Sequence, residues 1–227
     1  MIFTVDIHHH MLPDFFWRAT NEGDHPVGGI TPPPWSRAST LSFLDDAGID
    51  VAVTSISTPG VHAGDDTAAR ALARRCNELA AELTRDRPDR FGGFARTPDV
   101  KYVFAHAGGT VPYLAGRFGI IDEMGVIPEA EARATAAQTF RRLYWDTALS
   151  WGDPVLRMLR DVAGLDHVLF GSDYPYLRRD LAVSSRQHIH ASPELTDGER
   201  KAILGVTATK LIPRLATLRS QTQPHAS

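Results

Sequence analysis

The stretch that decides the fold is Val5-Asp6-Ile7-His8-His9-His10, close to the start of the chain. Apolar residues precede and alternate with the polar ones, which is typical of a buried strand, and we expect one over residues 2–7. Side chains two positions apart on a strand point to the same side. His8 and His10 can therefore reach one point at the C-terminal end of this strand.

A second apolar run occupies residues 168–170 and leads through Gly-Ser to Asp173. If the first strand and this late strand lie side by side, Asp173 meets His8 and His10. Two imidazoles and one carboxylate form a reasonable ligand set for zinc or another divalent metal. The alternatives are that the histidines are surface residues or the remnant of a tag, and that Asp173 begins a turn. An apolar run around the histidines favours the metal site.

Length and composition are those of one globular domain with a sizeable core. The chain has 227 residues, of which 43% are hydrophobic and 22% charged. A net charge of −3 gives no electrostatic reason to expect nucleic acid or an anionic membrane as a partner. The single cysteine, Cys76, cannot form an intrachain disulfide. No apolar run is as long as a membrane span and no signal-peptide pattern is present, so we expect a cytoplasmic protein.

The rest of the chain alternates strand patterns with helix patterns. Strands are expected at residues 2–7, 51–57, 90–95, 102–105, 143–146 and 167–170. Helices are expected from residue 39 to near 48, at 65–85, 129–141 and 154–162, and over most of the tail. Residues 18–36, rich in Gly and Pro, predict a loop. This order favours an α/β fold with a parallel sheet or a (β/α) barrel, whose chemistry lies at the C-terminal ends of the strands.

At this point four phrases together resemble the amidohydrolase-related metal-dependent decarboxylases, the relatives of aminocarboxymuconate-semialdehyde decarboxylase. They are residues 6–13 (DIHHHMLP), 91–95 (FGGFA), 104–109 (FAHAGG) and 170–175 (FGSDYP). Two further phrases are similar to the 6-methylsalicylate decarboxylase branch in particular, namely residues 33–36 (PPWS) and 55–62 (SISTPGVH). The resemblance extends over nearly the whole chain.

The resemblance implies one TIM-barrel domain of the metal-dependent hydrolase type over residues 1–227. His8 and His10 would match the metal ligands after the first strand, and Asp173 the carboxylate ligand after the last, where it would also belong to the catalytic group. His106 would match the catalytic histidine, beside a metal-bound water. Zn²⁺ would be the metal, with Mn²⁺ as the alternative, and the protein would be a homodimer.

The activity that the resemblance implies is that of a carboxy-lyase, the non-oxidative decarboxylation of a small aromatic carboxylic acid such as a 6-methylsalicylate-like compound. The metal would activate its water or polarise a substrate oxygen. A neutral His106 would take a proton and later help protonate the ring carbon that loses carboxylate. The alternative for His106 is a core histidine that ends a strand. The two glycines that follow it favour a tight turn at a site instead.

The chain is shorter than the resemblance requires. A (β/α)₈ barrel usually needs about 250 residues, and only six residues, 96–101, separate the third expected strand from the fourth. Such a join is too short for a helical crossover between parallel strands. The resemblance places two further βα units and a third metal histidine here. We therefore expect an internal deletion near residues 96–101, leaving either open sheet edges or a smaller barrel. His62 is the nearest candidate to replace the missing histidine.

Two other functions remain open at this stage. The same constellation could activate water for attack on an ester or amide, as in a metal-dependent hydrolase of the lactonase or amidohydrolase type. The missing ligand is also consistent with a non-catalytic, truncated homologue. For an enzyme a small-molecule site is expected rather than a nucleic-acid or membrane surface, whereas a non-catalytic homologue would be an interaction protein or a pseudoenzyme.

Overall fold

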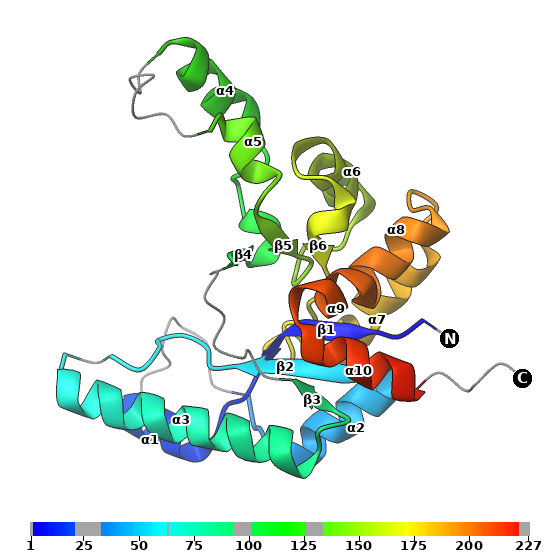
Figure 1. Ribbon diagram of the computed structural model, residues 1–227. Helices are drawn as coiled ribbons and strands as arrows, with labels where there is room; N and C mark the ends of the chain where they lie inside the picture. Colours follow the sequence, from blue (N-terminus) through cyan, green and yellow to red (C-terminus); the bar gives the residue numbers. More distant parts are fainter. Residues whose placement is uncertain (1, 21–32, 63, 93–100, 126–133, 223–227) are drawn as a thin grey trace, which may run out of the picture.

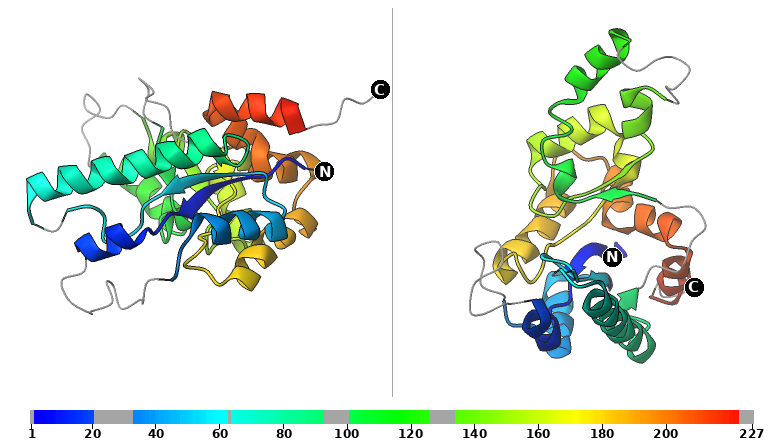
Figure 2. Two further views of the ribbon diagram at one scale, coloured as in Figure 1. Left: turned by 90° about the horizontal axis from the view of Figure 1, so that it is seen from below. Right: turned by 90° about the vertical axis from the view of Figure 1, so that its left-hand side faces the viewer.

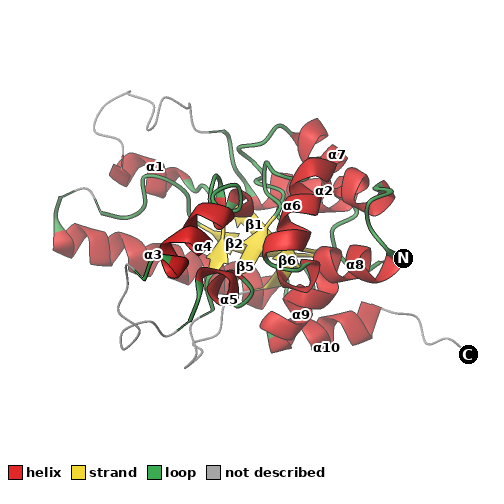
Figure 3. Ribbon diagram, turned by 90° about the horizontal axis from the view of Figure 1, so that it is seen from above, coloured by secondary structure: helices red, strands yellow, loops and turns green. Residues whose placement is uncertain are grey.

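The structure is a computed structural model that describes residues 2–20, 33–62, 64–92, 101–125 and 134–222. Its strands are β1 (Val5–His10), β2 (Val51–Ser55), β3 (Phe91–Gly92), β4 (Val103–Phe104), β5 (Tyr144–Asp146) and β6 (Val168–Leu169). The helices are α1 (Asp14–Thr20), α2 (Arg37–Ala47), α3 (Asp66–Asp86), α4 (Ala115–Glu123), α5 (Ala136–Phe140), α6 (Asp153–Val162), α7 (Arg179–Ala191), α8 (Asp197–Lys201), α9 (Thr207–Leu211) and α10 (Pro213–Thr222). Strands lie at the centre and helices surround them, which confirms the α/β class (Figure 3).

The strands form two parallel sheets of three, in the orders β1-β2-β3 and β4-β5-β6. Backbone hydrogen bonds join the sheets where the chain after β6 runs beside β1. Ile7 N–H donates to Phe170 O at 3.0 Å, Asp173 N–H to His8 O at 2.9 Å, and His10 N–H to Tyr174 O at 2.8 Å. The first and last strands are therefore neighbours, and the order across the molecule is β3-β2-β1-β6-β5-β4.

The two sheets lie in two lobes of the molecule. Helices α1, α2 and α3 accompany the first sheet and α4, α5 and α6 the second (Figures 1 and 2). No described strand pairs with the outer edge of β3 or of β4. Of the two outcomes expected for a shortened barrel, the described strands thus show open edges rather than a smaller closed barrel. The expected deletion point at residues 96–101 lies outside the described residues except for Lys101.

Apolar side chains fill the space on both sides of the strands, as expected for parallel strands that are covered by helices. The larger cluster joins β-strand residues such as Phe91 and Trp145 to the helices that flank the sheets. The smaller cluster packs Val5, Val51 and Leu169 against Leu215 of α10. None of the described helices is long and apolar enough to cross a membrane.

Local signals account for the helices that the sequence predicts. Ser36 accepts a hydrogen bond from Ser39 N–H to begin α2, and Gly48, with a φ of +65°, ends it. Asp65 caps α3 by accepting from Ala68 N–H at 2.6 Å. One face of α3 is buried at the spacing expected for residues 65–85.

The expected boundaries of the first strand were wrong. β1 runs over Val5–His10 rather than residues 2–7. The strand continues because both β2 and the chain after β6 supply backbone partners as far as His10. His8 and His10 thus lie within the strand and not beyond it, which restricts their backbone more tightly than a loop would.

Several other segments differ from the expectation. Residues 18–20 belong to α1 rather than to the expected loop, of which residues 21–32 lie outside the described chain. The expected strand at 90–95 is described only as far as Gly92, and the expected helix at 129–141 only from residue 134. Helix α4 was not expected. Because it buries none of its side chains, it has no apolar periodicity to detect.

Gly205 allows a test of the packing between the C-terminal segment and Phe3, which precedes β1. It lies in a π-helical turn (Ala202–Val206), where an added Cβ would overlap the backbone carbonyl oxygen of Phe3. We expect Gly205→Ala to lower the free energy of unfolding by about 2–3 kcal/mol, because backbone cannot yield as a flexible side chain can. The matched control is Gly119→Ala in α4, where the Cβ would meet nothing within 4 Å. Urea unfolding monitored by circular dichroism gives the stabilities of both variants. Equal stabilities of Gly205→Ala and Gly119→Ala would contradict the close packing of Gly205 on Phe3.

Candidate metal and catalytic site

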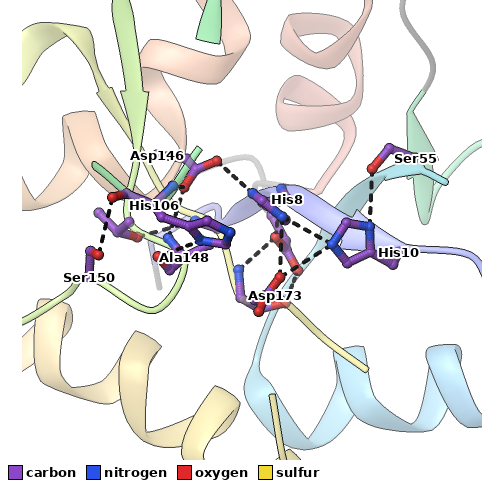
Figure 4. A network of polar contacts seen from close by, with 12 residues as sticks. His8, His10, Ser55, His106, Asp146, Ala148, Ser150 and Asp173 are labelled. Atoms are coloured by element: carbon purple, nitrogen blue, oxygen red, sulfur yellow. Dashed lines mark hydrogen bonds and ion pairs between the residues drawn. The ribbon is translucent and has the colours of Figure 1, made fainter. Parts of the chain in front are cut away.

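Three of the residues singled out from the sequence meet where β1 lies beside the chain that follows β6 (Figure 4). His8 Nε2 lies 3.0 Å from His10 Nε2. Both nitrogens lie 3.2 Å from Asp173 Oδ1. The three side chains are largely buried, with exposed fractions of 12%, 9% and 8% for His8, His10 and Asp173. The structure thus brings together the two imidazoles and the carboxylate.

The strand itself explains this convergence. The side chains of His8 and His10 lie on one side of β1, and that of His9 lies on the other. His9 is fully buried, and its Nδ1 lies 3.1 Å from Asp6 Oδ2. Asp6 also accepts hydrogen bonds from the backbone N–H and the hydroxyl of Ser172, the residue before Asp173. Asp6 therefore fastens β1 to the turn that carries Asp173. That turn places Asp173 at a φ of +59°, a region in which Asp is tolerated better than most residues.

Burial and hydrogen bonding set the charges of the cluster. Burial lowers the pKa of His8, but hydrogen bonds with Asp146 and Asp173 outweigh it and raise that pKa to about 10. Burial is also the main cause that lowers the pKa of His10, against the opposite pull of Asp173. For Asp173, burial favours the neutral acid, but the two histidines outweigh it and hold its pKa far below the ordinary value. These shifts favour a protonated His8 beside an ionised Asp173, so a proton occupies the cluster of potential metal ligands.

The spacing of the donor atoms suits a divalent metal. Bonds of about 2.0–2.1 Å to a tetrahedral or octahedral ion place neighbouring ligand atoms about 3.0–3.4 Å apart. The three separations of 3.0–3.2 Å fall in that range. Each histidine also has a partner for its outer nitrogen, since Asp146 lies 2.7 Å from His8 Nδ1 and Ser55 Oγ 3.4 Å from His10 Nδ1. Such outer partners are typical of metal-binding histidines.

His106 lies on a tight turn directly after β4. Its φ is +55°, and the turn is completed by Ala107 and Gly108, which also have positive φ. The backbone of Gly108 packs so closely on the Trp145 ring that a Cβ there would clash. The ring of His106 is 5.0 Å from that of His8, measured between centroids. Its Nδ1 lies 3.1 Å from Ala148 O, which can only accept, so Nδ1 carries a proton and Nε2 is the basic nitrogen.

Asp146 is a residue of this site that the sequence analysis missed. It ends β5 and is 2% exposed. Its carboxylate contacts both His8 and the backbone of His106. Together His8, His106 and Asp146 form a second group whose ligand atoms lie close to one another. The signal that selected Asp173, an acid at the end of a buried strand, applies equally to Asp146.

His62 does not replace the missing histidine. It lies in the loop after β2, its ring is 57% exposed, and its Nε2 is 3.0 Å from Asp66 Oδ1 in the first turn of α3. Among the described residues, neither group able to hold a metal includes His62. The described chain therefore offers two histidines and one aspartate around the first candidate metal position, without a third histidine.

Sequence comparisons give the context for this geometry. The amidohydrolase family model matches residues 92–214, more than half of the chain. The chain is 22% identical to 6-methylsalicylic acid decarboxylase from Penicillium expansum and 23% identical to 6-methylsalicylic acid decarboxylase acuB from Aspergillus aculeatus. Each alignment covers 93% of this chain and 96% of the relative. The alignments extend over 318 and 320 positions, against 227 residues here, so this chain lacks a long segment that both relatives contain.

Solved structures confirm the expected fold. The chain resembles an amidohydrolase II with a TM-score of 0.80 at 17% identity, over 92% of this chain and 99% of the other. The TM-score is 0.75 at 14% identity for 5-carboxyvanillate decarboxylase LigW from Sphingomonas paucimobilis, covering 94% and 99% of the two chains. It is 0.74 at 16% identity for dihydroxybenzoic acid decarboxylase from Polaromonas, which contains bound manganese, covering 93% and 97%. The described elements thus have the arrangement of an amidohydrolase-type barrel that is open between β3 and β4.

Metal content tests the ligand set directly. We expect the purified wild-type protein to hold about one equivalent of a divalent metal and His8→Ala to hold less than about a tenth of it, because the variant loses one of three donors. The control is His62→Ala, which removes an exposed imidazole outside the site. Elemental analysis after dialysis measures both. Equal metal content in wild type and His8→Ala would exclude His8 as a ligand.

Proposed function

We propose, from the premise that this chain belongs to the amidohydrolase family, that it is a metal-dependent non-oxidative decarboxylase of a small aromatic carboxylic acid of the 6-methylsalicylate type. The observation that carries this proposal is the convergence of His8, His10, Asp173 and His106 beside the ends of parallel strands. The similarity to two 6-methylsalicylic acid decarboxylases over 93% of the chain supports the substrate class.

In this proposal His8, His10 and Asp173 hold the metal. When bound, a divalent metal would polarise a substrate oxygen or lower the pKa of a water molecule. The metal-free cluster fits this role because its three donor atoms already have the spacing of neighbouring ligands, with no large rearrangement required. Asp173 would contribute to catalysis through the same carboxylate that fixes the ligand geometry.

His106 would move the proton. Decarboxylation breaks the bond between the carboxylate and a ring carbon, carbon dioxide leaves, and the electron pair stays on that carbon. Nε2, which carries no proton in the neutral ring, would first take one from solvent and then deliver it to that carbon, where it forms the new C–H bond and leaves the imidazole neutral again. The contact of His106 Nδ1 with Ala148 O supports this assignment, because it keeps the ring oriented and leaves Nε2 to carry the transferred proton.

The identity of the metal is part of the proposal. Zinc is the metal that we propose, with manganese as the alternative, since imidazole and carboxylate ligands accept both. Manganese is bound in related solved structures of a 5-carboxyvanillate decarboxylase and of a dihydroxybenzoic acid decarboxylase. Reloading the metal-free protein with each ion would identify the metal that restores activity.

We also propose that residues 1–227 form a single barrel domain shortened by an internal deletion near residues 96–101. The six described strands, the open outer edges of β3 and β4, and alignments far longer than the chain support this. A homodimer is the proposed assembly. It is supported by large apolar side chains that are exposed and concentrated in one stretch of the chain, at Tyr102, Phe104, Tyr113, Phe118, Ile120, Ile121 and Met124.

Activity on 6-methylsalicylate tests the reaction and the role of His106 together. We expect metal-loaded wild type to release carbon dioxide, and His106→Asn to lower kcat by about 10²–10⁴-fold with unchanged metal content. The asparagine side chain can still donate toward Ala148 but offers no nitrogen able to carry the transferred proton. His62→Asn is the control. Ring opening of lactones without release of carbon dioxide would instead favour a hydrolase, and a fully loaded but inactive protein a non-catalytic homologue.

The assembly is tested by placing a charge on α4. We expect wild type to elute as a dimer at micromolar concentration and Ile120→Asp to elute as a monomer, because a buried carboxylate opposes apolar contact. The control is Leu181→Asp on α7, which alters an exposed apolar residue outside the stretch 102–124. Size-exclusion chromatography with light scattering gives the masses. A monomeric wild type would refute the proposed dimer.

A further inference from the structure

The Asp146 carboxylate contacts both candidate functional histidines and is almost completely buried (Figure 4). Its Oδ2 lies 2.7 Å from His8 Nδ1. Its Oδ1 accepts hydrogen bonds from the backbone N–H of His106 at 2.8 Å and of Ala148 at 3.0 Å. One side chain at the end of β5 thus connects β1 to the turn that follows β4.

The contact with Oδ2 determines which nitrogen of His8 faces the metal position. A carboxylate can only accept, so His8 Nδ1 carries the proton and Nε2 points toward His10 and Asp173. The backbone of Gly171 packs against the His8 side chain so closely that a Cβ at position 171 would lie 2.7 Å from His8 Cβ. The position of His8 is thus set by Gly171, and the orientation of its ring by Asp146.

The contacts with Oδ1 determine the position of His106. The φ of +55° at His106 is unfavourable for a residue other than glycine, so the turn needs external hydrogen bonds to persist. Asp146 holds the backbone N–H of His106 directly. It also holds the N–H of Ala148, whose carbonyl oxygen in turn accepts from His106 Nδ1.

We propose that Asp146 is a positioning residue that fixes the tautomer of His8 and the orientation of the His106 ring, so that Nε2 of both histidines serves the metal-dependent reaction. This inference rests on the proposed function, because it assigns Asp146 a role through the two histidines and not as a metal ligand. Carboxylates that orient metal-binding histidines in this way typically change metal affinity by 10–100-fold when they are lost.

Asparagine is the substitution that separates positioning from packing. It has the same shape as aspartate, and its oxygen can still accept from the N–H groups of His106 and Ala148. Its NH₂ group, however, would face His8 Nδ1 and cannot accept the proton there. His8 must then carry its proton on Nε2, the nitrogen that faces His10 and Asp173, and that proton competes with a metal.

Zinc affinity is the first measurement, by competition with a chelating dye. We expect Asp146→Asn to weaken zinc binding by about 10–100-fold while the melting temperature of the metal-free protein stays close to that of wild type. The matched control is Asp153→Asn, which alters another aspartate that contacts an imidazole, His188 Nε2 at 2.9 Å, in a different part of the fold. Unchanged zinc affinity in Asp146→Asn, or an equal loss in Asp153→Asn, would overturn the inference.

Histidine NMR of the wild-type protein is the second measurement, and it does not depend on whether Asp146→Asn folds. In ¹⁵N-labelled, zinc-loaded wild type, assigned by comparison with His8→Ala, we expect His8 to carry its proton on Nδ1 and to bind zinc through Nε2. Zinc on Nδ1, or a proton on Nε2, would overturn the inference. If wild type binds neither zinc nor manganese, the proposed function fails instead. The spectrum of the metal-free protein then still tests the role of Asp146. The contact with Asp146 requires a proton on His8 Nδ1, so the absence of that proton would refute it.

Discussion

The parallel pairing of β1 with the chain after β6 is the interaction on which the rest of the structure depends. It is the backbone contact that joins the two described sheets, and the same hydrogen bonds bring His8 and His10 to Asp173. Asp6 reinforces the junction from a fully buried position, through Ser172. Because one set of hydrogen bonds serves both purposes, the candidate site cannot form unless the sheets are joined. Loss of the junction would expose apolar strand faces and separate the ligands in a single event.

The junction also concentrates charged and polar groups in the interior. Burying a charged side chain costs several kcal/mol unless a partner offsets it. Here Asp173 is paired with two imidazoles, His8 with Asp146, and His9 Nδ1 with Asp6, while the buried His9 Nε2 has no hydrogen-bond partner among the described residues. The donor atoms of His8, His10 and Asp173 also lie at the separation of neighbouring metal ligands. A cation that binds the folded form alone would stabilise it by mass action, so metal binding and stability are linked through this cluster.

The sequence predicts the proximity of His8, His10 and Asp173 better than it predicts the extent of the segments around them. Proximity of His8, His10 and Asp173 follows from a simple rule, that parallel strands bring their C-terminal ends to one edge, and the structure confirms that proximity. Asp146 obeys the same rule but stands at the end of a strand that carries no recognisable phrase, so nothing distinguished it. The extent of β1 could not be read locally, because it is set by pairing with distant segments, β2 on one side and Phe170–Tyr174 on the other. Helix α4 escaped prediction because it buries no face, and periodicity is a signal only where burial selects it.

The proposed shortening of the chain leaves most of the candidate site together, because the short join and the described site residues occupy different parts of the strand order. The candidate residues come from β1 and from the ends of β4, β5 and β6, which are consecutive in the order β1-β6-β5-β4. The short join lies between β3 and β4, at the far ends of that order. The proposed deletion there would remove strands and the third metal histidine that the resemblance implies, while the His8, Asp173, Asp146 and His106 contacts are present. The unfavourable surfaces that remain are the open edges of β3 and β4 and the exposed apolar stretch at residues 102–124. A second subunit can cover such surfaces more readily than it could replace a lost site.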